Sequence, residues 1–249
     1  MKLPIIMLML AAGVSAGTAA QTRLSVSRAC MDSTIAPDPA MLALIAPYRD
    51  SIATSLSSII GQADMDLEAY APESPLSNFV ADLILDKMKE EARLTGSVPV
   101  PDMSIVNLGG LRAPIAKGDI TMSTVFQVMP FENTIVVVEV TGRQLRSAFD
   151  NMARRGGDGL SGAHLTIDGG RVASVSVGGR PIDPDATYRV ATYNFIADGG
   201  DGYTAFVGCP VSESGVLVRQ AIIDRIVRIS AAGRGISAAV EGRITNEKD

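Results

Sequence analysis

Apolar residues recur at helical spacing in several separate stretches of the chain, and each stretch predicts an amphipathic helix. These stretches are residues 37–61, 73–92, 143–155 and 212–230. Pro47 lies inside the first stretch and is expected to kink or split that helix. Ser74 is suited to cap the second helix, with Pro75 in its first turn, and Ser212 or Ser214 is suited to cap the last.

Alternating or continuous apolar runs between these helices predict β-strands. We expect a strand entering a glycine turn at 102–110, a strand fragment with a short helix at 118–131, a buried strand at 133–142, a hairpin at 164–177 and a strand at 187–195. Helices and strands intermix without a strict β-α repeat. This order favours an α+β sandwich with mixed sheets.

The N-terminal residues have the layout of a secretory signal peptide. Lys2 precedes an apolar run that is too short to span a bilayer, and small residues follow at 18–20. We therefore expect a signal peptide at 1–20, a linker and helical arm at 21–60 and a globular domain at 61–249. After cleavage the chain is expected to be exported, periplasmic or extracellular, and soluble, with no transmembrane segment.

Cys30 and Cys209 are the only cysteines in the sequence. In an exported chain they either form one disulfide or stay reduced, and the sequence leaves both states open. A lipid anchor on Cys30 is a further alternative. The nearby Arg28 and the distance from the apolar run argue against that anchor.

The composition argues against several classes of function. The 249 residues include 22 Lys and Arg against 27 Asp and Glu, a net charge of −5 without a basic block, so nucleic acid is not an expected partner. His164 is the only histidine. The chain therefore lacks the several histidines that two-metal sites commonly use, and a Ser-His-Asp triad would have to be built on this one residue. We expect His164 to be an ordinary strand residue and expect neither a catalytic residue nor a metal or other cofactor in this chain.

Two glycine-rich stretches call for separate interpretations. Gly157, Gly159 and Gly162 match the pattern G-x-G-x-x-G, but they follow a predicted helix and no helix follows them, so the dinucleotide-binding context fails. The loop "NFIADGGDGY" at 194–203 has four alternatives: a metal loop, a phosphate cradle, a plain tight turn or the wall of a binding pocket. Its two aspartates miss the ligand positions of an EF-hand.

Three stretches, "NLGGLRAPI", "MPFEN" and "NFIADGGDGY", carry side chains that suit a nucleoside monophosphate, and the first and third contain glycines that allow close approach of a ligand. Arg112 can fork two hydrogen bonds to phosphate or ribose oxygens, Phe131 and Phe195 offer flat faces for a base, and Asp201 can accept from ribose hydroxyls. From spacing alone, core packing explains either phenylalanine equally well, and a surface ion pair explains Arg112.

These three stretches, in this order, resemble the C-terminal domain of the 5'-nucleotidase family, which includes the periplasmic UDP-sugar hydrolases. The resemblance runs from about Gly61 to Ile244 and is carried further by residues 73–85, 118–149, 180–203 and 241–244. It implies a layered α/β/β/α structure that holds the nucleotide. In this family a separate N-terminal metallophosphatase domain holds two metals and the catalytic His-Asp pair.

The resemblance also implies a set of substrate-binding residues. Asn107 and Arg112 would contact ribose or phosphate, the base would lie between Phe131 and Phe195, and Asp201 would contact the ribose. The full set is Asn107, Gly110, Arg112, Phe131, Asn133, Gly162, Phe195 and Asp201. The glycine-rich loop at 194–203 would then be a pocket wall.

The chain departs from the family pattern in three places. Leu108 stands where the glycine turn usually has its first glycine, and residues 68–74 lack the arginine that often precedes the first helix. We expect the metallophosphatase domain to be missing, because the residues before Gly61 are too few for it. The chain is then a nucleotide-recognition subunit that acts with a separate metallophosphatase carrying the divalent metals, a solitary nucleotide- or nucleoside-binding protein, or a relic scaffold that binds neither.

Overall fold

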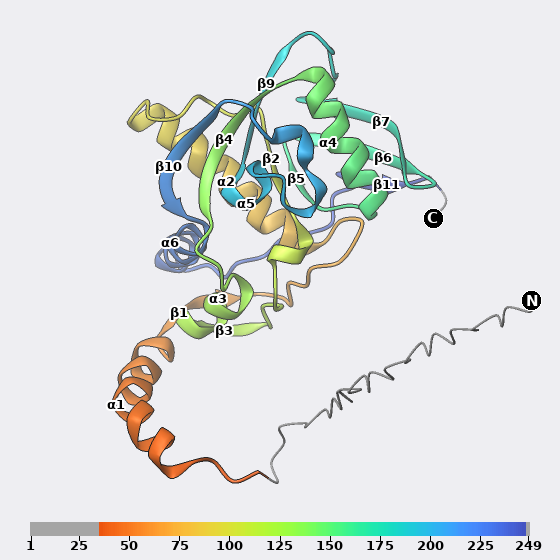
Figure 1. Cartoon of the computed structure of the whole chain (residues 1–249). Helices are drawn as coiled ribbons and strands as arrows, with labels where there is room; N and C mark the ends of the chain where they lie inside the picture. The colour runs from red at the N-terminus through yellow and green to blue at the C-terminus, as the bar shows by residue number, and fades with distance from the viewer. Residues whose placement is uncertain (1–34, 248–249) are drawn as a thin grey trace, which may run out of the picture. The chain divides into compact units, whose positions relative to one another are not determined.

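The computed structural model describes residues 35–247 (Figure 1). The predicted signal peptide and Cys30 lie outside these residues. The chain divides into two units between Ala46 and Pro47, and most of the described residues belong to the second unit. That compact second unit contains all the described strands.

The first helix, α1, spans Pro39–Leu56. The carboxylate of Asp38 accepts hydrogen bonds from the backbone N–H groups of Ala40 and Met41, at 2.8 and 3.2 Å, as an N-cap does. A kink or a split was expected at Pro47, and the split does not occur, because the helix continues through this residue. A proline inside a helix removes one backbone hydrogen bond, and here that loss does not end the helix.

The same helix is shorter at its C-terminal end than its apolar pattern predicts. Ile59–Ala63 form strand β1, which pairs antiparallel with β3 (Gly118–Thr121). Helix α6 (Val218–Ala231) packs so closely on β1 that a Cβ on Gly61 would lie 2.6 Å from Cγ2 of Ile226. The partner strand lies far along the sequence, so the local period could not reveal this pairing.

Helix α2 (Pro75–Leu94) begins where the sequence predicts. The Ser74 hydroxyl accepts from the Ser77 N–H, and the Ser77 hydroxyl accepts from the Ser74 N–H, which together form a capping box. Residues 75–81 are buried on all sides, and Leu83, Ile84, Leu85 and Met88 are buried further along the helix. The helix contacts the strands β2 (Met103–Val106), β4 (Thr134–Thr141), β5 (Gly159–Ser161) and β9 (Thr187–Tyr193). The apolar stripe is therefore core, as its spacing indicates.

A mixed five-stranded sheet forms the centre of the compact unit. Its order is β10 (Val211–Leu217), β4 (Thr134–Thr141), β9 (Thr187–Tyr193), β2 (Met103–Val106) and β5 (Gly159–Ser161). Strands β2 and β9 run parallel to each other, whereas the other pairs in this sheet are antiparallel. Consecutive residues Ile135–Val138 of β4 are all buried, which requires cover on both faces of the sheet.

The predicted start of the last helix is wrong. Residues 211–217 form edge strand β10, and helix α6 spans Val218–Ala231 without a side-chain cap. Ser214 does not cap a helix; its hydroxyl donates to the Ile135 carbonyl oxygen at 2.7 Å. Ser212 pairs with Val137 in the sheet. Serine suits a helix cap and an edge strand equally well, and the pairing with β4 decides between them.

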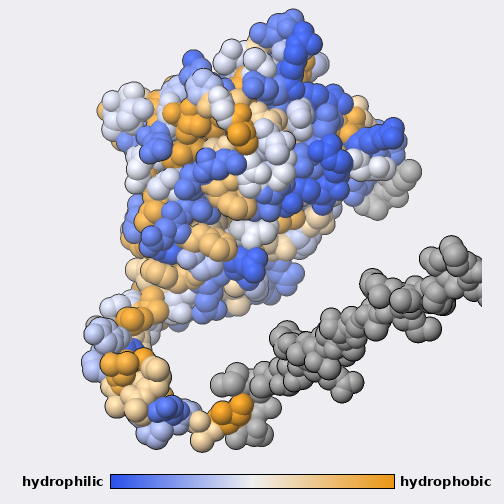
Figure 2. Space-filling view, viewed as in Figure 1, coloured by the Kyte–Doolittle hydropathy of each residue, from blue (hydrophilic) through white to orange (hydrophobic). Residues whose placement is uncertain are grey.

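A second sheet of four strands packs on the other side of helix α4. Its order is β11 (Ile244–Asn246), β6 (Ala163–Asp168), β7 (Arg171–Val177) and β8 (Arg180–Pro181). Helix α4 (Gly142–Arg155) contacts β4 and β9 of the central sheet and β7 of the second sheet. Figure 2 shows mainly hydrophilic residues on the face over α4 and β7. The expected α+β sandwich with mixed sheets is confirmed.

The remaining elements are short. They are the helices α3 (Met122–Val128) and α5 (Asn194–Ala197) and the 3-10 turns η1 (Leu108–Gly110), η2 (Gly200–Gly202) and η3 (Thr204–Phe206). Among the described residues, no helix is both long enough and apolar enough to cross a bilayer.

The carboxylate of Glu73 fastens the C-terminal segment to the start of α2. It accepts hydrogen bonds from the Asn78 side chain at 2.6 Å, from the Glu241 N–H at 2.7 Å and from the Ile244 N–H at 3.2 Å. Burial raises the pKa of this carboxyl, but the hydrogen bonds from Glu241, Asn78 and Ile244 together outweigh burial and hold the pKa below its ordinary value of 4.5.

Replacing Glu73 by glutamine is expected to lower the free energy of unfolding by about 1–3 kcal/mol at neutral pH, because charge-assisted hydrogen bonds are lost. A lowered folded-state pKa gives stability that is present above the unfolded-state pKa and is lost as the pH falls through the folded-state value. The difference between wild type and Glu73→Gln should therefore shrink as the pH falls below about 4.5 in urea-unfolding curves. Glu213→Gln, on the exposed edge strand, is the matched control, and a pH-independent difference would contradict the prediction.

Candidate binding site

Three loops meet at one edge of the central sheet because of the way its strands are paired. The parallel strands β2 and β9 both end at this edge, where η1 follows β2 and α5 with η2 follows β9. Strand β4 is antiparallel to β9, with Ile135 opposite Tyr193, so it begins at the same edge. The stretches "NLGGLR", "MPFEN" and "NFIADGGDGY" are therefore neighbours in space although they are far apart in the sequence.

A cavity of about 270 Å³ lies between these loops. Its lining residues are Asn107, Gly109, Gly110, Arg112, Phe131, Asn133, Phe195 and Asp201. All of the sequence-predicted substrate-binding residues except Gly162 belong to this lining. Gly109 is an addition that the sequence argument did not single out.

Gly162 lies at the other end of strand β2. Its Cβ would sit 2.7 Å from the carbonyl oxygen of Asp102, the residue that precedes β2. Strand β5 runs antiparallel to β2, so Gly159 is opposite Val106 near the cavity edge while the chain leaves β5 at the opposite edge. Gly162 is therefore not brought together with the other predicted residues.

Two phenylalanines give the cavity its apolar wall. Phe131 and Phe195 are each 43% exposed, whereas Phe149 and Phe206 are completely buried in the core. The ring of Phe195 lies against the chain at Gly200, where a Cβ would come within 2.5 Å of the ring atom Cε1. Aromatic faces left open to solvent beside polar groups suit a flat ligand.

Asp201 is held in a strained backbone conformation at the polar end of the cavity. Within residues 35–247 it is the only non-glycine residue with a positive φ, at 53°. Its Oδ2 accepts from Asn107 Nδ2 at 2.5 Å and from Arg155 Nη2 at 2.9 Å, and its carbonyl oxygen accepts from Asn151 Nδ2 at 3.0 Å. Strain that the surroundings enforce in this way often marks a functional residue.

A buried carboxylate supports this end of the cavity from behind. The side chain of Asp158 is 0% exposed, and it accepts from the Leu108 N–H at 2.9 Å, from the Tyr203 hydroxyl at 2.7 Å and from Arg155 Nε at 3.2 Å. Burial raises the pKa of Asp158, although the hydrogen bonds from Leu108 and Tyr203 and the charge of Arg155 oppose that shift. Arg155 thus bridges the buried Asp158 and the cavity residue Asp201.

Asn107 has one fixed orientation in the cavity. Its Oδ1 accepts from the Tyr193 hydroxyl, and its Nδ2 donates to Asp201. Burial raises the pKa of Tyr193 and keeps the phenol a donor.

The turn after β2 tolerates a side chain at one position and not at another. Glycine is required at 110, because a Cβ there would lie 2.6 Å from the Tyr193 hydroxyl oxygen. Leu108 stands where the resemblance leads one to expect a glycine. It adopts a 3-10 conformation that any residue can adopt, so the turn forms with leucine at this position.

Arg112 is the exposed cation at the cavity. Its Nη1 donates to the Gly109 carbonyl oxygen at 3.2 Å, which leaves most of the guanidinium donors open. The arrangement therefore offers aromatic faces at Phe131 and Phe195, a carboxylate acceptor at Asp201 and a cation at Arg112. A base, a hydroxylated sugar and an anion match these three features in turn.

Sequence reasoning missed the supporting residues Arg155, Asp158, Tyr193 and Tyr203. Tyr193 directly precedes the glycine-rich loop at 194–203 and Tyr203 is its last residue, and this position is the one signal that the sequence offers for them. Arg155 is the last residue of α4, and Asp158 lies between α4 and β5. Both come near the cavity only through the pairing of β5 with β2.

Other sequence features lie apart from the cavity. His164 is an exposed residue of β6, as its alternation predicts. Gly157 lies between α4 and β5, Gly159 begins β5, and Gly162 lies between β5 and β6, so the G-x-G-x-x-G match has no helix after it. Cys209 accepts a hydrogen bond from Gln144 Nε2, and the disulfide with Cys30 stays untested because Cys30 lies outside the described residues.

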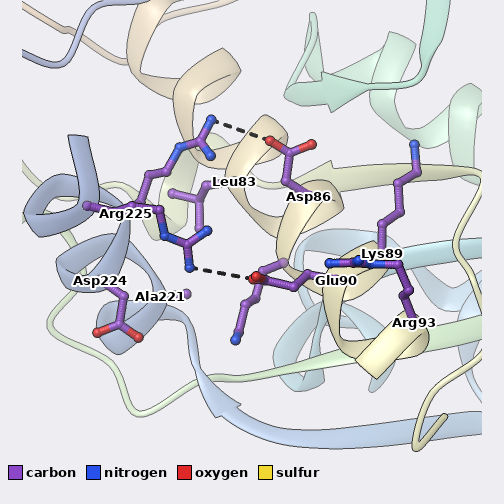
Figure 3. A pocket seen from close by; sticks show the side chains of 10 residues that line it. Leu83, Asp86, Lys89, Glu90, Arg93, Ala221, Asp224 and Arg225 are labelled. Atoms are coloured by element: carbon purple, nitrogen blue, oxygen red, sulfur yellow. Dashed lines mark ion pairs between the residues drawn. The ribbon is translucent and has the colours of Figure 1, made fainter. Parts of the chain in front are cut away.

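A larger hollow of about 420 Å³ lies between α2 and α6 (Figure 3). Arg225 pairs with Asp86 at 3.4 Å, and Arg228 pairs with Glu90 at 3.5 Å, as the dashed lines show. These ion pairs tie one helix to the other. The hollow is thus a salt-bridged helix contact without aromatic faces, and it suits a nucleotide poorly.

In the part of the chain that the structure describes, no three His, Cys, Asp or Glu side chains gather as metal ligands would. The expectation that divalent metals belong to another polypeptide stays a prediction.

Comparisons with known proteins agree on one family. The sequence profile of the family described as "5'-nucleotidase, C-terminal domain" matches residues 52–208. The trifunctional nucleotide phosphoesterase protein YfkN of Bacillus subtilis is 34% identical over 229 residues, which is 81% of this chain. The protein UshA of Yersinia enterocolitica is 34% identical over 177 residues, which is 68% of this chain. The 5'-nucleotidase precursor of Thermus thermophilus superposes with a TM-score of 0.70 at 31% identity over 84% of this chain.

The chain spans only part of each of these proteins. It matches 15% of YfkN, 30% of UshA and 43% of the Thermus thermophilus chain.

Proposed function

This chain belongs to the family of 5'-nucleotidase C-terminal domains, and we propose that its Phe131–Phe195 cavity binds the nucleoside part of a nucleotide in a 5'-nucleotidase-type hydrolase. One observation supports the proposal above all others. Two half-exposed phenylalanine rings share a cavity with the anchored carboxylate of Asp201 and the exposed cation of Arg112. This combination matches a base, a ribose and a phosphate.

The size of the cavity supports a binding mode in which the base and sugar lie inside the cavity and the phosphate lies outside it. A volume of about 270 Å³ lies just below the range of roughly 300–1,000 Å³ that is usual for complete small-molecule sites. It has room for a base and its sugar, whereas the phosphate would remain at the mouth beside Arg112. A phosphate in that place is accessible to a second polypeptide surface.

Cleavage of the phosphate is proposed to occur on a separate metallophosphatase subunit that carries the divalent metals. This chain would hold the nucleoside and orient the phosphate, and positioning of this kind lowers the barrier without any group of this chain reacting. A complex of the two subunits needs an interface on the order of 1,600 Å². The signal-peptide pattern of residues 1–20 supports an extracytoplasmic site of action.

The proposal is tested by titrating the purified chain with AMP, UMP and UDP-glucose in a calorimeter, with and without divalent metal, while released phosphate is assayed in the same samples. We expect saturable, metal-independent binding without phosphate release. Adding a metallophosphatase that lacks this domain should produce co-elution in gel filtration and a gain in hydrolysis. Binding without any partner effect would instead favour a solitary nucleotide-binding protein, and no binding by the wild type would refute both.

A further inference from the structure

We propose that Arg219, in the first turn of α6 and outside the cavity lining, is the positioning residue for the Phe131 wall. The inference rests on the proposed nucleotide-binding function of the cavity. It assigns a role to a side chain that acts on the ligand only through Phe131.

Arg219 holds the loop between α3 and β4 through hydrogen bonds to the loop backbone. Its Nη1 donates to the carbonyl oxygens of Met129 and Phe131, both at 3.3 Å. Pro130 lies between these residues and has no backbone N–H, so the loop has one donor fewer with which to fix itself. The guanidinium supplies donors to carbonyls on both sides of the proline.

The guanidinium is itself held in one place. Its central carbon lies 4.3 Å from the centre of the Phe126 ring, within the range of a cation–π contact. The Arg219 side chain is only 12% exposed, and its Nη2 lies 3.8 Å from the Glu132 carboxylate. The planar guanidinium can lie over the ring while its N–H groups reach both carbonyls, whereas an ammonium group has no planar face to place against the ring.

The neighbouring residue of α6 adds a second tie to the same loop. The Val218 N–H donates to the Asn133 carbonyl oxygen at 2.9 Å. The first turn of α6 therefore holds the loop at both ends of the segment that carries Phe131. Further along the same helix, Arg225 and Arg228 pair with Asp86 and Glu90 of α2 instead, and neither arginine lines the cavity.

The first test does not depend on any ligand. Amide hydrogen exchange of peptides that cover residues 126–134 is compared between wild type, Arg219→Met and the control Arg228→Met, which removes an arginine of the same helix that is paired to α2. Loss of the two hydrogen bonds to the carbonyl oxygens should make amide exchange in this segment about tenfold faster in Arg219→Met, whereas Arg228→Met should exchange as the wild type does. Equal exchange in the two variants would overturn the proposal.

The second test asks whether Arg219 acts through Phe131. Arg219→Met is expected to weaken binding of AMP by about tenfold in the wild-type background and to have no further effect in the Phe131→Ala background. Arg219→Lys should recover part of the affinity, because its ammonium group keeps the charge and N–H donors but lacks the planar face that lies over the Phe126 ring. An equal loss in both backgrounds would overturn the positioning role.

The two tests separate this inference from the proposed function. If the wild-type chain binds none of the nucleotides, the proposed function fails, whereas the exchange measurement still decides whether Arg219 holds the Phe131 loop. Thermal unfolding of each variant, followed alongside, shows whether faster exchange is confined to residues 126–134 or accompanies a general loss of stability. A general loss, with exchange faster throughout the compact unit, would also count against a local positioning role.

Discussion

Phe195→Ala is expected to weaken binding of AMP by roughly 5- to 150-fold, because stacking of a base on an aromatic ring is worth about 1–3 kcal/mol. Phe195 is nearly half exposed at the cavity, so its removal sacrifices little core packing and should leave the unfolding transition almost unchanged. Combining it with Phe131→Ala should remove measurable binding. Titration calorimetry with AMP measures the affinity, and urea unfolding measures the stability.

Two further variants sharpen this prediction. Phe195→Leu keeps the apolar contact but loses the flat face, so its affinity should lie between those of wild type and Phe195→Ala. Val227→Ala removes an exposed apolar side chain of α6 outside the cavity lining and should bind AMP as the wild type does. If Phe195→Ala binds AMP with unchanged affinity, the ring is not the platform for the base and the proposed ligand is wrong.

Asp158→Ala is expected to lower the free energy of unfolding by about 3 kcal/mol, because several buried donors lose their acceptor together. The Tyr203 hydroxyl and the Leu108 N–H would be left without the oxygen that each now contacts, and Arg155 would keep only Asp201. Since the Leu108 N–H belongs to the turn that carries Asn107, the affinity for AMP should fall as well. Urea unfolding at neutral pH measures the loss of stability.

Asp150→Ala is the matched control for this prediction. Asp150 also pairs with an arginine of α4, Arg146 at 3.4 Å, but both side chains are about half exposed. Exposed ion pairs contribute roughly 0–1 kcal/mol, so the control should unfold nearly as the wild type does. Equal, small losses for the two variants would show that the buried network around Asp158 does not hold the cavity edge.

Part of the candidate site was predictable from residue types and their neighbours. Phe195 and Asp201 could be chosen because they belong to a glycine-rich loop, and Phe131 because the chain has only 6 phenylalanines. The structure brings these three side chains to one cavity, while their contact with a nucleotide stays a prediction. Arg219 could not be chosen this way, because in the sequence it is one more arginine on an amphipathic helix.

By itself, the sequence determined the main helices, most strands and the residue types available for a ligand, because helical period, capping residues and glycine turns act within a few residues of one another. Only the tertiary structure decided which of these residues share a cavity. The parallel pairing of β2 with β9 and the antiparallel pairing of β4 with β9 bring three loops to one edge, whereas antiparallel β5 carries Gly162 to the other. Such pairings depend on hydrogen bonds between segments far apart in the chain, and no local period records them.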